Sequence, residues 1–87
     1  MNKEEIVAIT NNVFAELFEV PAEKLVPQAR IFDELGLDSL DTVDLVVALQ
    51  KRFNVQIRED ERVRSIRTLN DVYEFILRLE QEKSQKS

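Results

Sequence analysis

Hydrophobic residues recur at steps of three and four in three stretches of the chain, and polar residues fill the positions between them. This spacing predicts amphipathic helices over residues 3–18, 39–53 and 69–82. In the first helix, the residues expected to face the core are Ile6, Ile9, Thr10, Val13, Phe14 and Leu17. Three such helices predict a domain whose core forms between their apolar faces.

The segments that connect these helices differ in length. Pro21 and Pro27 interrupt a connector over residues 19–37, which is long for a domain of this size and therefore a candidate for function. A shorter helix is expected over residues 59–64. We therefore predict an all-α fold, a small four-helix bundle with three long helices, one short third helix and a long loop between the first two.

The C-terminal residues 81–87 carry no apolar side chain that could anchor them to a core. We expect this tail to be disordered. A chain of 87 residues is long enough for one domain with a modest core. The folded domain is accordingly placed at residues 1–80.

The predicted helix over residues 39–53 carries two apolar stripes. The stripe expected in the core consists of Thr42, Leu45, Val46, Leu49 and Phe53. The second stripe points to another side and consists of Leu40, Val43 and Val47, with Asp41 and Asp44 beside it. Both stripes could be buried, but a central helix would not carry so many flanking carboxylates. We interpret the second stripe as a docking surface for a partner protein.

Charge is divided between two neighbouring segments of the chain. Residues 31–49 contain five carboxylates and no lysine or arginine, whereas residues 50–67 contain six basic and three acidic residues. Because the acidic segment surrounds Ser39, it would attract a partner with a basic surface toward that residue. A solvated helix face without a partner would instead carry charges of both signs.

The composition argues against several classes of function. The chain has no cysteine and no histidine, so it lacks thiolate ligands, the commonest general base and the commonest metal ligand. We therefore expect neither an enzyme nor a metal site. A formal net charge of −5 argues against nucleic-acid binding, and no apolar run approaches the ~18 residues of a membrane span. We expect a cytoplasmic monomer.

Ser39 lies where the long connector ends and the second helix begins, in the run Gly36-Leu37-Asp38-Ser39-Leu40-Asp41. Unpaired backbone N–H groups and the positive end of the helix dipole favour negative charge at a helix start. A phosphate ester on Ser39 would therefore be held without a basic pocket. The alternative is that Asp38 or Ser39 merely caps the helix and that Asp41 completes a capping box.

The run from Phe32 to Leu49, and above all its part from Gly36 onward, resembles the acyl carrier protein family. The resemblance continues through residues 53–57 and covers nearly the whole chain except the tail. It implies that a phosphopantetheinyl transferase attaches 4′-phosphopantetheine from coenzyme A to Ser39. The thiol at the end of this arm would carry acyl groups as thioesters, so the prosthetic group would supply the chemistry that the side chains lack.

The resemblance also implies roles for the residues near Ser39. Asp38 would help to present the serine to the transferase. The face gripped by the transferase and by acyl-transfer and chain-elongation enzymes, through their basic surfaces, would consist of Leu40, Asp41, Val43, Asp44 and Val47. The pocket that shelters the acyl chain would be lined by Leu49, Phe53, Ile57, Val63 and Ile66.

Two features depart from the pattern of members that serve fatty acid synthesis. The second helix continues with Gln50, Lys51 and Arg52 where those members usually have acidic residues. The region of the short helix is rich in arginine, and the stretch from Ile57 to Thr68 is one residue longer than is typical. Partners that need an extended acidic surface should therefore bind this chain less well.

These departures leave more than one function open. The chain would serve fatty acid, lipid or related biosynthesis, or it would be a carrier dedicated to lipopolysaccharide or secondary-metabolite synthesis. A peptidyl carrier usually has a Gly-Gly-His/Asp-type run before the serine, so Leu37-Asp38 favours an acyl carrier. The remaining alternative is a helical interaction module that carries no arm.

Overall fold

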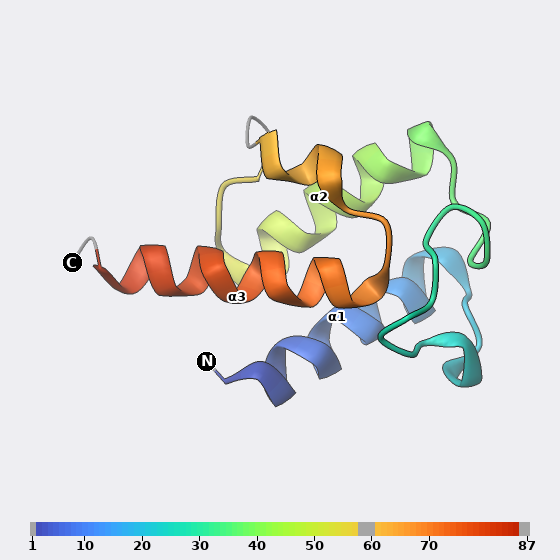
Figure 1. The fold of residues 1–87 in the computed structure, drawn as a ribbon, viewed down its shortest axis with the longest axis horizontal. Helices are drawn as coiled ribbons and strands as arrows, with labels where there is room; N and C mark the ends of the chain where they lie inside the picture. The colour runs from blue at the N-terminus through green and yellow to red at the C-terminus, as the bar shows by residue number, and fades with distance from the viewer. Residues whose placement is uncertain (1, 58–60, 86–87) are drawn as a thin grey trace.

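The computed structural model describes residues 2–57 and 61–85. Its long elements are three α-helices, α1 (Lys3–Phe18), α2 (Ser39–Phe53) and α3 (Leu69–Gln85). Two short 3₁₀-helices, η1 (Ala22–Lys24) and η2 (Glu61–Ser65), lie in the connections. Helix α1 runs in one direction, and α2 and α3 run back (Figure 1). The predicted all-α fold is confirmed, since the described residues contain no strand.

The predicted bounds of the first two long helices agree with α1 and α2. Helix α3 begins at Leu69 as predicted but continues to Gln85, so residues 81–85 of the predicted disordered tail are helical. Contacts with distant parts of the chain support this extension, because Glu82 lies 2.8 Å from Arg62 of η2. Residues 86 and 87 lie outside the described residues, and the domain limit at residue 80 stays a prediction.

The predicted short third helix is matched in part. A short helix was expected over residues 59–64, and the structure has the 3₁₀-helix η2, Glu61–Ser65, in this region instead of a fourth α-helix. Residues 59 and 60 lie outside the described residues. Arg62 anchors η2 to α3 by a bidentate pair with Glu82 and by the position of its guanidinium 5.5 Å from the centre of the Phe75 ring. Because Glu82 and Phe75 belong to another helix, the local sequence pattern around η2 does not show these contacts.

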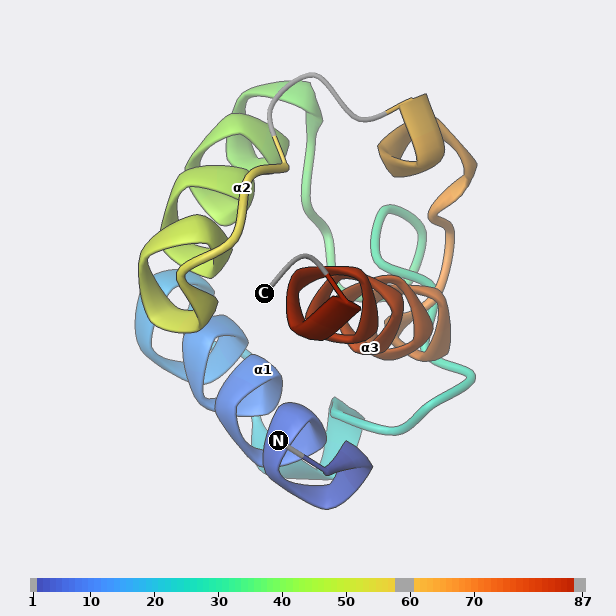
Figure 2. The ribbon, with the colours of Figure 1, turned by 90° about the vertical axis from the view of Figure 1, so that its left-hand side faces the viewer.

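The core lies where α1 packs against both α2 and α3 (Figure 2). The predicted core stripe of α2 is buried or half-buried along its length. Tyr73 of α3 donates a hydrogen bond to Asn11 of α1, and burial raises the pKa of the Tyr73 hydroxyl, which stays protonated at neutral pH. Leu17 is the exception among the predicted core positions of α1, because half of it is exposed.

The long connector is attached to the start of α3 by backbone hydrogen bonds. The Ile31 N–H donates to the Arg67 carbonyl over 2.9 Å, and the Leu69 N–H donates to the Ala29 carbonyl over 3.0 Å. Gly36 then adopts a positive φ of 77°, a conformation that L side chains rarely adopt, and the chain turns into α2. The connector therefore fixes the position at which α2 begins.

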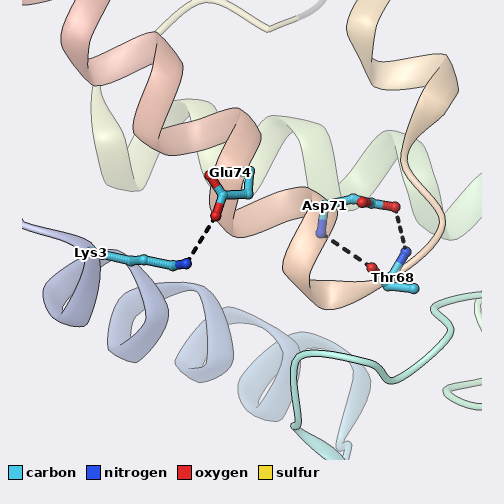
Figure 3. A network of polar contacts seen from close by, with 4 residues as sticks. All are labelled: Lys3, Thr68, Asp71 and Glu74. Carbon is cyan, nitrogen blue, oxygen red and sulfur yellow. Dashed lines mark hydrogen bonds and ion pairs between the residues drawn. The ribbon is translucent and has the colours of Figure 1, made fainter.

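The start of α3 is held by a reciprocal pair of hydrogen bonds between Thr68 and Asp71 (Figure 3). The Asp71 N–H donates to the Thr68 hydroxyl over 3.2 Å, and the Thr68 N–H donates to the Asp71 carboxylate over 3.1 Å. The same figure shows an ion pair of 2.9 Å between the half-exposed side chains of Lys3 and Glu74. The first interaction satisfies backbone donors of a helix start, whereas the second joins two solvated charges.

Replacement of Thr68 by alanine should lower the free energy of unfolding by about 1 kcal/mol, because it removes the acceptor for the Asp71 N–H. Lys3→Ala, which removes the exposed ion pair, should lower it by less than about 0.5 kcal/mol. Urea unfolding followed by circular dichroism measures both values. Equal losses in the two variants would show that the capping interaction is no more important than a surface pair.

Candidate functional site

Asp38 ends the connector and caps α2. Its Oδ1 accepts hydrogen bonds from the N–H groups of Leu40 at 2.9 Å and Asp41 at 3.0 Å. The Asp41 carboxylate in turn accepts a hydrogen bond from the Asp38 N–H at 3.1 Å, which completes a capping box. Ser39 is the first residue of α2 and is exposed, and in the described part of the chain its hydroxyl makes no hydrogen bond.

This capping box changes the expectation for a negative group on Ser39. The sequence suggested that unpaired N–H groups at the helix start would hold a phosphate there. The structure shows instead that two of these groups are bound to Asp38, and the Thr42 N–H donates to the Asp38 carbonyl over 3.1 Å. The carboxylates of Asp38 and Asp41 also repel an anion. The first turn of α2 therefore offers fewer free N–H groups to an anion than the sequence suggested.

The second apolar stripe of α2 lies on the surface. The exposed fractions are 76% for Leu40, 61% for Val43 and 39% for Val47, so the alternative in which both stripes are buried is wrong. Asp44 beside them is exposed and has no ion pair among the described residues, whereas Asp41 is half-buried in the capping box. The face thus combines accessible apolar side chains with one uncommitted carboxylate.

A cavity of about 40 Å³ lies between α2, η2 and the connector. Four of the five residues predicted to shelter an acyl chain lie on its wall, namely Leu49, Ile57, Val63 and Ile66. Phe53 is buried but does not line it. The sequence reasoning missed the other residues of the wall, which are Ile31, Phe32, Thr42, Leu45, Val46, Val72 and Phe75. The helical spacing that places Thr42, Leu45 and Val46 on the same face as Leu49 could have identified these three. No local signal marks the other four, because they meet α2 only through the fold.

The three residues that depart from the acidic pattern at the end of α2 have different environments. The Gln50 side chain accepts a hydrogen bond from the Ile57 N–H over 2.8 Å. The Arg52 guanidinium lies 3.9 Å from the Glu16 carboxylate of α1. Lys51 is exposed and lies one turn beyond the second stripe. Of the three, only Lys51 therefore places a positive charge beside that stripe without a partner within the described residues.

In the described ranges, 2–57 and 61–85, no helix is both long enough and apolar enough to cross a membrane. The same ranges hold no group of three or more carboxylates arranged to bind a metal ion.

Comparison with known proteins places this site in a family. A family model described as a phosphopantetheine attachment site matches residues 11–76. The chain is 40% identical over 76 residues to an acyl carrier protein of Thermosynechococcus vestitus, which covers 87% of this chain and 93% of that protein. It is 42% identical over 65 residues to an acyl carrier protein of Syntrophobacter fumaroxidans, which covers 75% of this chain and 79% of that protein.

The family match over residues 11–76 includes the connector, the whole of α2 and the walls of the cavity. The prosthetic group of the family is covalently attached 4′-phosphopantetheine, and its members carry acyl groups for other enzymes. A phosphopantetheinyl transferase attaches the arm. The chain therefore belongs to the acyl carrier protein family and is a thioester carrier of acyl groups, not an enzyme.

Proposed function

We propose that Ser39 is the residue that carries the 4′-phosphopantetheine arm. One observation carries this proposal. The Ser39 side chain is exposed on the first turn of α2, and its hydroxyl makes no hydrogen bond in the described residues, because Asp38 and not Ser39 caps the helix. Asp38 fixes the backbone at this point, so it positions Ser39 for the transferase. Once attached, the arm supplies the thiol that forms thioesters, a group that the chain itself lacks.

The exposed face of α2 is proposed as the surface on which partner enzymes dock. A bound partner would cover its apolar residues Leu40, Val43 and Val47. Removing these side chains from water would favour formation of the complex. Asp41 and Asp44 add negative charge that favours a basic partner surface. The transferase and the acyl-transfer and chain-elongation enzymes are the partners that this chemistry fits.

The apolar cavity is proposed as the shelter of the acyl chain. Its volume of about 40 Å³ is far below the ~150 Å³ of a cavity that accommodates benzene, so an acyl chain enters only if the walls move apart. The segment best suited to move is η2 with the residue that follows it, since Val63 of η2 and Ile66 directly after it are only half-buried. Phe53 supports the cavity from the core and is not assigned to its wall.

The pathway that the carrier serves is a separate part of the proposal. Carriage of acyl intermediates in fatty acid, lipid or related biosynthesis is the first proposal. A carrier dedicated to lipopolysaccharide or secondary-metabolite synthesis is the second, because Lys51 puts positive charge where a general fatty-acid enzyme would meet negative charge. The cytoplasmic location and the monomeric state stay predictions.

The attachment site is tested by loading the apo protein with coenzyme A and a broad-specificity phosphopantetheinyl transferase. Mass spectrometry should show one added arm on the native chain and none on Ser39→Ala. Because Asp38 caps α2, the alanine variant should retain its helical circular dichroism. Ser65→Ala, which alters an exposed serine at the end of η2, is the matched control and should be loaded normally. Loading of the Ser39→Ala chain would contradict the assignment.

The docking surface is tested by reversing the charge of Asp44. Asp44→Lys should slow association with the transferase by about three- to tenfold at low ionic strength, because it removes attraction for a basic surface. The difference should shrink as added salt screens the charges. Glu23→Lys makes the same charge change on η1 and should have little effect. If the two variants behave alike, only net charge matters and α2 has no special role.

The pathway is tested with a ketosynthase of general fatty acid synthesis and the acylated protein. Lys51→Glu should lower KM by about three- to tenfold with little change in kcat, because it removes like-charge repulsion during docking. Arg52→Glu should not give this improvement, since the Arg52 guanidinium lies over Glu16 of α1. A native protein that already equals a general fatty-acid carrier in this assay would rule out the dedicated-carrier proposal.

A further inference from the structure

Helices α1 and α2 border a surface groove that is separate from the acyl cavity. Two adjoining hollows of about 320 and 200 Å³ share three lining residues, Leu17, Ala48 and Lys51. The α1–α2 groove is defined here by Leu17, Phe18, Val47, Ala48, Lys51 and Arg52. Leu17 and Val47 leave 50% and 39% of their surface exposed, so the groove has an accessible apolar floor.

Positive charge lies along one side of this groove. Lys51 is exposed and forms no ion pair within the described residues. Arg52 is partly neutralised by Glu16, 3.9 Å away. Asp44 lies on the wall of the larger hollow, nearer to the start of α2. The groove therefore offers the ammonium of Lys51 beside apolar side chains at one end and the carboxylate of Asp44 at the other, neither of them in an ion pair among the described residues. The Lys51 end complements a carboxylate next to an apolar group, and the Asp44 end complements a cation.

The groove is continuous with the proposed docking face. Val47 belongs to the exposed stripe with Leu40 and Val43, and it also lines the larger hollow. An enzyme seated on that stripe would reach the groove without leaving the surface of α2. The charge changes along this path, from the carboxylates near Ser39 to the ammonium of Lys51.

We propose that the α1–α2 groove is a second contact site for partner enzymes, occupied by a helical segment that inserts an apolar side chain beside Leu17 and Val47 and places a carboxylate against Lys51. The location of this site rests on the proposed docking function of α2. A partner that is basic along the whole contact meets Lys51 with like charge and is disfavoured, so the groove selects partners that carry both charges.

The proposal is tested with two synthetic helical peptides and the isotope-labelled full chain. Both peptides carry one central leucine, flanked by glutamates in the first and by lysines in the second. In two-dimensional NMR spectra, the glutamate peptide should shift amide signals of residues 13–18 and 44–52. Leu17→Asp should weaken this binding by roughly tenfold or more, because it removes an apolar contact and adds a carboxylate that repels the glutamates of the peptide.

Two further variants separate the apolar contribution from the charge. Lys51→Glu should weaken binding of the glutamate peptide and strengthen that of the lysine peptide. Val26→Asp, which alters another exposed apolar residue outside the groove, is the control and should change neither. Because Lys51 is exposed, its variant remains informative even if Leu17→Asp fails to fold.

Several outcomes would overturn the proposal. These are shifts outside the groove, equal binding of the two peptides, and no effect of Lys51→Glu. Shifts at the groove that depend on protein concentration without peptide would identify a second copy of the chain as the occupant instead. Loading of Ser39 does not enter this experiment, so failure of the groove leaves the attachment site untouched, and failure of loading leaves the groove result intact.

Discussion

The reciprocal hydrogen bonds of Asp38 and Asp41 are the interaction on which the site depends. They satisfy two backbone donors of the first turn and the Asp38 N–H, and they fix where α2 begins. Ser39 is left as an exposed first residue with no capping task of its own. A carrier needs one accessible hydroxyl in a fixed place and no catalytic group beside it, and this arrangement provides both.

The connector couples this helix start to the cavity. Its backbone is hydrogen-bonded to the segment before α3 through Ile31 and Arg67, and the neighbouring Phe32 forms part of the cavity wall. The same stretch then turns at Gly36 and ends in the cap of α2. The helix start that presents Ser39 and one part of the cavity wall are thus built on one continuous segment.

The basic segment over residues 50–67 does not form a uniformly basic surface. Arg62 is committed to Glu82, and the Arg67 guanidinium donates to the carbonyls of residues 64 and 66 at the end of η2. Arg52 lies over α1. These arginine side chains stabilise short or terminal elements by contacts with carboxylates and carbonyls. Their positive charge is therefore largely paired with groups of the protein itself. Lys51 and Arg64 are exposed and form no ion pair among the described residues, and of these two Lys51 lies at the edge of the exposed stripe of α2.

The sequence by itself determined the features that depend on neighbours along the chain. Apolar spacing and capping residues predicted the helices over residues 3–18 and 39–53 and the place of Ser39, because helix periodicity and capping are local. Periodicity shows which face of a helix is apolar, but it does not show what covers that face. Only the tertiary structure therefore decided that Leu17 is half-exposed, that α3 extends to Gln85, and that the connector contributes to the cavity wall, since each depends on residues distant in the chain.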